Sequence, residues 1–277
     1  MKTTRELEKI SYQIRKTALE TIQEAGSGHI GGSFSIAEML SVLYFDKMRI
    51  DPADPQMEDR DRFVISKGHC SPAVYSALAL RGFFPVEHLK TFRKLTSDLS
   101  GHVEMHVPGV DMSTGSLGQG LSVALGMAMY GQRKQYGNRA FCILGDGEIQ
   151  EGQVWEAVMA AGHFQAHNLI AFIDHNKLQL EGPVEQTMGI EPIGDKFRAF
   201  RWNVIEVDGH DVAQLSAAID LAGSQKEKPT AIVCDTIKGK GVSVFENQVR
   251  FHGGHPTAAE FETAYAELNR KIASLED

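Results

Sequence analysis

The chain has 277 residues, 42% hydrophobic and 23% charged, a composition typical of a globular protein with a substantial core. The net charge of −8 argues against a nucleic-acid partner, because nucleic-acid-binding surfaces normally show a basic excess. The first residues lack an apolar signal core, and no apolar run approaches the roughly 18 residues of a membrane span. Cys142 and Cys234 lie in apolar strand-like runs, which favours buried thiols in a reducing compartment. We therefore expect a cytoplasmic protein with no membrane partner.

Helical periodicity and short apolar runs alternate along the chain. In chain order we expect a helix at 6–24, a helix at 36–48 with Ser35 as its N-cap, a strand at 63–66, a helix at 117–136, a strand at 141–144, a helix at 154–164, strands at 169–173 and 204–207, a helix at 212–222, a strand at 231–234 and a helix at 257–273. This alternation predicts an α/β fold with a mainly parallel sheet and helices on both faces. No linker or repeat interrupts it, so we expect a single domain over residues 1–277.

Polar residues follow two of the expected strands. The sequence GDGE begins at Gly145, directly after one strand, and Asn176 follows the next strand, 30 residues beyond Asp146. A parallel sheet would bring these two loops together at the edge where ligands gather. The Asp146 carboxylate and Asn176 amide offer oxygen ligands to a divalent cation, and Mg²⁺ commonly completes its shell with phosphate oxygens. Taken alone, GDG is equally well explained as a strand-to-helix turn in which Asp146 caps the helix.

A GDG sequence followed by such an asparagine resembles the thiamine diphosphate-binding motif. The resemblance implies a metal site formed by Asp146, Asn176 and the carbonyl of Leu178, with the cofactor diphosphate completing the shell. The metal would be Mg²⁺, or Ca²⁺ or Mn²⁺ in its place. The N–H group of Gly147 would contact the diphosphate.

Further segments identify the branch of that family. They are SGHIGGS at 27–33, SKGH at 66–69, GHVE at 101–104, STGSLGQG at 113–120, GDGEIQEG at 145–152, KGKGV at 238–242 and FHG at 251–253. In kind and order these segments resemble the motifs of the thiamine diphosphate-binding half of transketolases. Ile30 and Val103 replace prolines that are common in the family, so the channel for the acceptor sugar is expected to differ.

The resemblance assigns four histidines to the active site. His69 and His252 would donate to the diphosphate, and His252 would also reach the substrate. His29 and His102 would bind sugar hydroxyls and relay protons, which suits imidazole because its pKa lies near neutrality. A lone histidine beside a glycine is more often a simple loop residue, and the role of His106 and His255 stays open.

The resemblance also places a group of loop residues at the cofactor: Gly115, Ser116, Leu117, Gly145, Gly147, Glu148 and Lys238. A lysine at position 238 or 240 could instead be a solvated charge, but over a diphosphate its point charge would be useful. Glu151 could be a plain acidic residue in a first helical turn. In the family the matching glutamate is catalytic, because it reaches across a subunit boundary toward the activating glutamate of the partner.

Thiamine diphosphate catalysis needs that activating glutamate and a pocket for the aminopyrimidine ring. In transketolases both belong to a second domain, and this chain resembles only the first half of the family pattern. We therefore expect the partner to be a C-terminal transketolase subunit, in an α2β2 assembly. The heteromer would transfer a two-carbon ketol group from a ketose phosphate, or a similar anionic ketose, to an aldose acceptor.

Three other functions share parts of these motifs. The α subunit of a 2-oxo-acid dehydrogenase also carries the GDG and asparagine pair, but the glycine–histidine elements and TGSLGQG argue against it. A deoxyxylulose-phosphate synthase is disfavoured by QEG after GDG. A non-catalytic subunit that only holds the cofactor is disfavoured by His29, His102 and His252.

Overall fold

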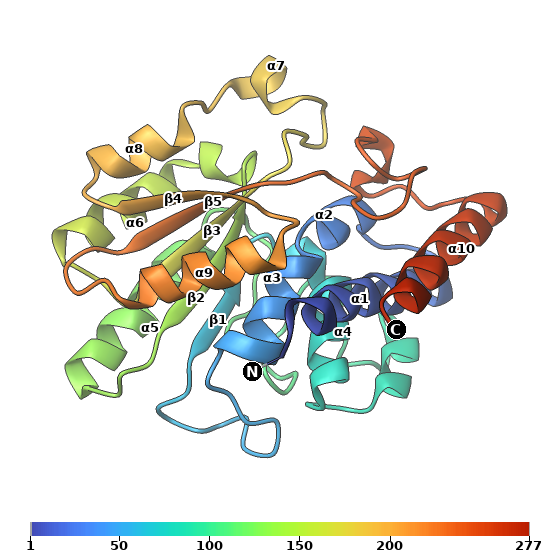
Figure 1. Ribbon diagram of the computed structural model, residues 1–277, viewed down its shortest axis with the longest axis horizontal. Helices are drawn as coiled ribbons and strands as arrows, with labels where there is room; N and C mark the ends of the chain where they lie inside the picture. Colours follow the sequence, from blue (N-terminus) through green and yellow to red (C-terminus); the bar gives the residue numbers. More distant parts are fainter. Residues whose placement is uncertain (1, 277) are drawn as a thin grey trace.

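The computed structural model describes residues 2–276, which fold around a five-stranded parallel sheet (Figure 1). The strand order is β1, β2, β3, β5, β4, so the last strand of the chain lies between the third and the fourth. All neighbouring strands run parallel. The bounds are β1 Arg62–Ile65, β2 Ala140–Gly145, β3 Leu169–His175, β4 Asn203–Asp208 and β5 Thr230–Asp235. Each expected strand is confirmed, with ends that differ by no more than two residues.

The sheet is covered on both faces, which explains why its strands are apolar without interruption. Successive strand residues point to opposite faces. In β2, Phe141 and Ile143 belong to one hydrophobic cluster, whereas Cys142 and Leu144 belong to another, and all four are fully buried. The predicted α/β architecture is therefore confirmed. Cys142 and Cys234 are free and buried, as expected, and so is Cys70.

Four helices cover one face and three cover the other. The first set is α1 Thr4–Ala25, α3 Ala37–Val42, α4 Ser71–Arg81 and α9 Val212–Gly223, and the second is α5 Gly120–Lys134, α6 Gly152–His163 and α8 Ile193–Ala199. The short helix α7 Val184–Met188 follows the β3 loop. Shorter helical turns span Leu43–Lys47 (π-helical) and, in 3₁₀ form, Gly68–Cys70, Val86–Thr91, Glu148–Gln150 and Val249–His252. None of the helices within residues 2–276 is long and apolar enough to cross a membrane.

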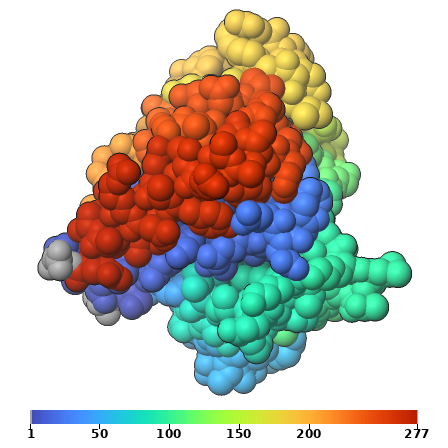
Figure 2. All heavy atoms as spheres, turned by 90° about the vertical axis from the view of Figure 1, so that its right-hand side faces the viewer, coloured from blue at the N-terminus to red at the C-terminus, as the bar shows by residue number. Residues whose placement is uncertain are grey.

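A third cluster joins the two ends of the described chain. It packs α2 Ile30–Ser35 and α10 Ala258–Ser274 against Ala18, Leu19 and Ile22 in the C-terminal half of α1. Figure 2 shows the C-terminal segment, in red, lying across the N-terminal residues, in blue. Helices α1 and α10 both begin with a capping box, in which a threonine hydroxyl and a glutamate three residues later satisfy the first N–H groups.

Two expected helices need correction. Ser35 does not cap a helix at 36–48: it ends α2, and its hydroxyl donates to Asp174 at 2.7 Å. Helix α3 is capped at Ile36 and continues from Leu43 as a π-helical turn. The helix expected from residue 117 begins only at Gly120, because Gly118 adopts φ +81°, a left-handed conformation that a helix does not accommodate. The sequence reading missed α4, because most of this helix is buried and its apolar pattern has no polar face.

Candidate active site

The carboxyl ends of β2, β3 and β5 form the floor of the candidate site. Gly145 of β2 pairs with Asp174 of β3, and His175 of β3 pairs with Asp235 of β5, so the loops that follow start side by side. Asp146 and Asn176 emerge from neighbouring strands, as the sequence predicts. Ligands bind at this edge of parallel sheets because loops and helix N-termini converge there.

Asp146 is a buried carboxylate, only 2% exposed. It accepts hydrogen bonds from the backbone N–H groups of Gly147, at 2.8 Å, and Lys177. Burial, together with the nearby charge of Asp174, raises the pKa of Asp146 to about 6. This carboxylate has main-chain donors but no ion-pair partner in residues 2–276, so a cation would stabilise its charged form.

Asn176 is held in one orientation by Asp174. The Asn176 amide Nδ2 donates to the Asp174 carboxylate at 2.8 Å, and its Oδ1 accepts from the backbone N–H of Leu178 at 3.2 Å. The flip of the amide is therefore fixed, with its oxygen on the side of the Leu178 loop. An oxygen ligand held in this way suits a hard divalent cation.

The sequence reading missed the charged pair beneath these residues. Lys67 and Asp174 form an ion pair with a 2.5 Å contact, and the exposed fractions of their side chains are 3% and 0%. Ser35 and Thr236 also donate to Asp174. Burial opposes ionisation, but Lys67 outweighs it and lowers the pKa of Asp174. The available signal was a carboxylate at the end of an otherwise apolar strand, two residues before the asparagine.

These residues fit a metal bridged to a diphosphate. Within the described chain no group of three or more histidine, cysteine, aspartate or glutamate side chains could hold a metal alone. Asp146, Asn176 and the Leu178 carbonyl offer three oxygens of the kind Mg²⁺ prefers, and phosphate oxygens are the natural complement. The Leu178 carbonyl accepts from Lys238 at 2.8 Å, so this oxygen already binds a positive charge.

Four histidines from distant motifs converge beside this loop, as the sequence predicts. The ring centroid of His29 lies 5.0 Å from that of His69, 5.7 Å from that of His252 and 6.5 Å from that of His102. His69 and His252 stack at 5.3 Å. They belong to the loop before α2, two short 3₁₀ turns and a loop before α5, so tertiary folding alone brings them together.

Three of these imidazoles are neutral near pH 7. Burial, and then the charges of neighbouring groups, lower the pKa of His29 to about 4 and that of His252 to about 3. Burial and Lys67 lower the pKa of His69 well below its usual value. The Nδ1 atom of His29 is buried and has no hydrogen-bond partner among residues 2–276. A neutral ring with a free nitrogen can bind a polar ligand and exchange a proton with it.

Lys238 lies inside the site, whereas Lys240 does not. Lys238 is 2% exposed, and besides the Leu178 carbonyl its ammonium contacts Nδ1 of His252 at 2.9 Å. Burial and the charge of Lys67 lower the pKa of Lys238 to about 8. Lys240 pairs with Glu246 at 3.6 Å instead. Gly31 leaves room for Lys238, because a Cβ at this position would lie 2.8 Å from the lysine side chain.

Glu148, expected at the cofactor, faces the protein interior. It is 4% exposed, and its carboxylate accepts from the N–H groups of Gly118 and Gly145, each at 2.9 Å, and from the Ser66 hydroxyl. Burial raises its pKa. Glu148 thus joins the GDG loop to the loop before α5, and a direct contact with cofactor stays a prediction.

The loop before α5 lines a depression of about 510 Å³ that also includes His102. Its lining contains Gly115 and Ser116, two of the residues expected at the cofactor. Leu117, the third, is 38% exposed. Glu151 is exposed at the start of α6, beside the turn at Gly118, and its side chain makes no capping hydrogen bond.

The remaining histidines lie outside the cluster of four. His106 contacts the backbone carbonyl of Asp98 at 2.9 Å, and the ring of His255 packs against Phe261. His175 pairs with Glu191 at 2.9 Å. The structure thus separates the histidines of the motifs from those without one.

Comparison with known proteins identifies the family of the chain. Residues 7–271 match the family model described as "Transketolase, thiamine diphosphate binding domain". The chain therefore belongs to the transketolase family and carries its thiamine diphosphate-binding domain.

Two similar relatives have nearly the same length. The 6-deoxy-6-sulfo-D-fructose transketolase subunit of Clostridium sp. (strain MSTE9) is 46% identical, over 94% of this chain and 95% of that protein. An apulose-4-phosphate transketolase subunit of Phocaeicola vulgatus is 40% identical, over 98% of this chain and 96% of that protein. This chain is thus a transketolase subunit of the same kind.

Longer transketolases match over part of their length. The transketolase of Rattus norvegicus is 40% identical over 89% of this chain, which corresponds to 39% of that protein. The crystal structure of the Campylobacter jejuni transketolase matches all of this chain with a TM-score of 0.90 and 29% identity. The match covers 46% of the Campylobacter jejuni chain. The chain spans less than half the length of these two relatives.

Proposed function

We propose that this chain is the cofactor-binding subunit of a two-subunit transketolase that uses thiamine diphosphate and Mg²⁺. The heteromer transfers a two-carbon ketol group from a ketose to an aldose. The observation that carries this proposal is the convergence of His29, His69, His102 and His252 beside the Asp146–Asn176 edge of the sheet. The α subunit of a 2-oxo-acid dehydrogenase shares the Asp146–Asn176 pair but not the glycine–histidine elements. A non-catalytic subunit would need the residues that contact the cofactor but not the histidines that act on the sugar.

The metal would be bound by Asp146, Asn176 and the Leu178 carbonyl. The Lys238 ammonium would form an ion pair with the diphosphate. When bound, thiamine diphosphate supplies the electron sink for cleavage of the carbon–carbon bond beside the ketose carbonyl. The chain contributes orientation and charge. The raised pKa of Asp146, about 6, shows that burial disfavours its charged form. A cation bound to the carboxylate would offset this cost.

The histidines divide the remaining tasks. His69 and His252, which stack on each other beside Lys238, would donate to the diphosphate. His29 and His102 would bind the hydroxyl and carbonyl oxygens of the sugar and pass protons to and from them. The low pKa of His29, about 4, leaves its ring able to accept a proton from a hydroxyl near pH 7.

A partner subunit would supply the aminopyrimidine pocket and the activating glutamate, in an α2β2 assembly. The names of the two relatives of nearly the same length, both called subunits, support this part of the proposal. Glu151 is exposed at the start of α6 and is free to reach across such an interface. The three free thiols suit a reducing compartment such as the cytoplasm.

The substrate would be a ketose with a terminal anionic group. One relative is named for a sulfonated sugar and the other for a phosphorylated branched sugar, which supports anionic sugars as a class. Ile30 and Val103, which replace family prolines, are both fully buried beside the motif histidines in sequence and would shape the acceptor channel. Parallel assays with matched phosphorylated and sulfonated ketoses would identify which anionic group the substrate carries.

The test is reconstitution. A tag on this chain isolates the complex and so identifies the partner subunit. The two chains are then purified individually and assayed separately and mixed, with thiamine diphosphate and Mg²⁺. Ketol transfer should appear in the mixture alone and saturate near equal molar amounts. Turnover by this chain without the partner, or a mixture that decarboxylates 2-oxo acids and transfers no ketol group, would overturn the proposal.

A further inference from the structure

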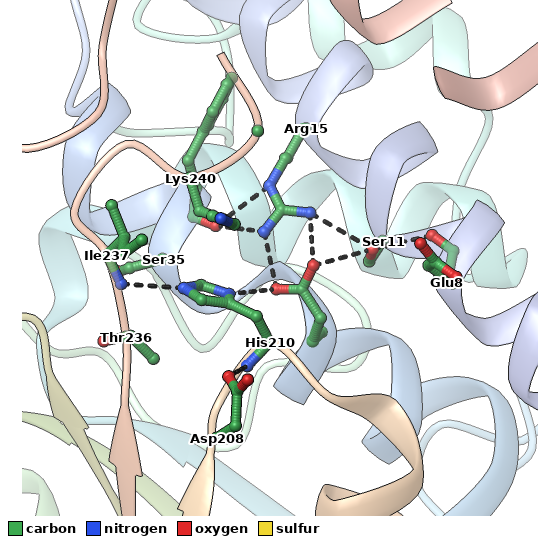
Figure 3. A network of polar contacts seen from close by, with 12 residues as sticks. Glu8, Ser11, Arg15, Ser35, Asp208, His210, Thr236, Ile237 and Lys240 are labelled. Atoms are coloured by element: carbon green, nitrogen blue, oxygen red, sulfur yellow. Dashed lines mark hydrogen bonds and ion pairs between the residues drawn. The ribbon is translucent and has the colours of Figure 1, made fainter. Parts of the chain in front are cut away.

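A buried polar network connects the first helix to the loop that carries Lys238 (Figure 3). Arg15 of α1 and Glu38 of α3 form two contacts of 2.6 Å, and their side chains are 0% and 4% exposed. His210, in the loop between β4 and α9, contacts Glu38 through Nδ1 at 3.0 Å. On its other side, Nε2 of His210 accepts from the backbone N–H of Ile237 at 2.8 Å.

These contacts fix the tautomer of His210. The Ile237 N–H group donates, so Nε2 carries no hydrogen, and Nδ1 must carry it and donate to the Glu38 carboxylate. Burial alone would raise the pKa of Glu38, but Arg15 and His210 outweigh it and lower the pKa to about 2. Glu38 is therefore a permanent acceptor, which orients the ring with its free nitrogen toward Ile237.

Ile237 directly precedes Lys238, so this hydrogen bond acts on the main chain of the lysine. The loop is held at two further points: the Gly239 N–H donates to the Gly31 carbonyl at 3.0 Å, and the Asn247 N–H donates to the Lys238 carbonyl at 2.9 Å. On the side before the lysine, the Thr236 hydroxyl donates to Asp174 at 2.5 Å, and His210 anchors Ile237, the residue directly adjacent to Lys238. Figure 3 shows the imidazole of His210 lying between Ile237 and Arg15.

We propose that His210 is a positioning residue for cofactor binding: through Ile237 it holds the backbone so that the Lys238 ammonium points to the diphosphate site. The inference rests on the proposed function, because it takes the Lys238 contact with the diphosphate as given. His210 itself touches neither Leu178 nor His252, the two residues that the ammonium contacts. The inference therefore requires that its effect on the cofactor pass through Lys238.

Two substitutions distinguish the contact that Nδ1 of His210 makes with Glu38 from the contact that Nε2 makes with Ile237. In His210→Asn the amide still donates to Glu38 but is too short to accept from Ile237. In His210→Gln the longer side chain can present its oxygen to Ile237. Arg15 continues to neutralise Glu38 in both variants, so neither leaves a buried charge unpaired. His163→Asn, at the exposed end of α6, is the matched control.

The experiment is a double-mutant cycle with Lys238→Met, on the complex of this chain with its partner subunit. Calorimetric titration measures thiamine diphosphate affinity in Mg²⁺. His210→Asn should weaken affinity about tenfold, which corresponds to about 1.4 kcal/mol, while His210→Gln and His163→Asn stay within about twofold of the wild type. In the Lys238→Met background, His210→Asn should change affinity less than about twofold, because the group it positions is absent.

Additive losses in the double variant would overturn the inference, and so would equal losses from His210→Asn and His210→Gln, since either result means a general structural role. Should His210→Asn not fold, His210→Ala, which also removes the acceptor for the Ile237 N–H, takes its place in the two backgrounds, and a thermal melt of each protein shows that it is folded. A loss of affinity in His210→Ala that persists in the Lys238→Met background would likewise overturn the inference. A wild-type complex that binds no thiamine diphosphate would instead refute the proposed function.

Discussion

At the scale of single residues, the site contains two buried carboxylates, Asp174, which has an ion-pair partner, and Asp146, which has none among residues 2–276. Asp174 is neutralised by Lys67 and accepts from two hydroxyls, so its charge is stable in the folded chain. Asp146 has main-chain donors alone, and its pKa is raised to about 6. A cation and a diphosphate would supply what Asp146 lacks, whereas Asp174 needs neither.

Asp146→Ala should abolish Mg²⁺-dependent binding of thiamine diphosphate, because the diphosphate loses its bridge to the protein. Asn176→Ala should cost less, since a water can replace the amide oxygen. Calorimetric titration of the complex in Mg²⁺ measures both, with Asp195→Ala on the exposed side of α8 as control. Unchanged affinity in Asp146→Ala would contradict the metal assignment.

His29→Ala and His102→Ala should keep cofactor affinity and lose turnover. Removal of an acid–base or positioning group typically lowers kcat/KM by roughly ten- to ten-thousand-fold. Steady-state kinetics and cofactor titration of the same preparations make the comparison. A fall in cofactor affinity as steep as the fall in turnover would show that these histidines serve the cofactor and not the sugar.

The low pKa of His29 should make stability depend on pH. Its pKa is about 4 in the folded chain and about 6.5 when unfolded, so the unfolded chain binds more protons between these values. Stability should therefore fall as pH drops from about 6.5 to about 4. Urea unfolding across this range, compared with His29→Phe, isolates the effect, and the variant should show a shallower decline. Parallel curves for the two proteins would contradict it.

At the scale of elements, helix α10 illustrates how local signals set a boundary. The Thr257 hydroxyl accepts from the Glu260 N–H, and the Glu260 carboxylate accepts from the Thr257 N–H at 2.8 Å. Helical periodicity predicts this helix from residue 257, and the structure begins it at Ala258, with Thr257 as the N-cap. By contrast, the start of α5 depends on the left-handed conformation of Gly118. The local sequence does not predict this conformation, because it is set by how the loop packs in the fold.

Thr257→Ala should lower the free energy of unfolding by about 1 kcal/mol, the usual cost of losing an N-cap. Thr263→Ala, inside the same helix, is the matched control and should change stability little, because its hydroxyl bonds back to the Ala259 carbonyl. Urea denaturation of the three proteins measures the difference. Equal stability of the two variants would show that the capping box contributes nothing here.

At the scale of the whole molecule, several large apolar side chains are exposed on loops and helices around the site. They include Met105 at 57%, Leu117 at 38%, Leu180 at 61% and Met188 at 62%. Exposed apolar groups of this size on segments that flank a site are typical of a surface that another chain covers. They agree with the proposed partner subunit.

Glu151→Ala should weaken activation by the partner, because this exposed glutamate would contact the partner's activating group. The expected result is a lower maximal rate in the reconstituted mixture, by about tenfold or more, with unchanged folding of the isolated chain. Glu227→Ala, on the loop before β5 at the opposite end of the sheet, serves as control. A full rate for Glu151→Ala would leave Glu151 a plain surface residue.

The strands, the longer helices and the motif residues could be predicted from the sequence, because apolar periodicity and glycine-rich loops are local properties of the chain. The proximity of Asp146 and Asn176 could also be predicted, since neighbouring parallel strands end at one edge of the sheet. The pairing of the buried charges became known from the packed structure: Lys67 pairs with Asp174, and Glu38 with Arg15 and His210. Glu38 and His210 are 172 residues apart, and no local pattern encodes a contact formed when helices and strand ends pack. For the same physical reason, Glu148 could be placed in its loop from the sequence, but its inward direction could not.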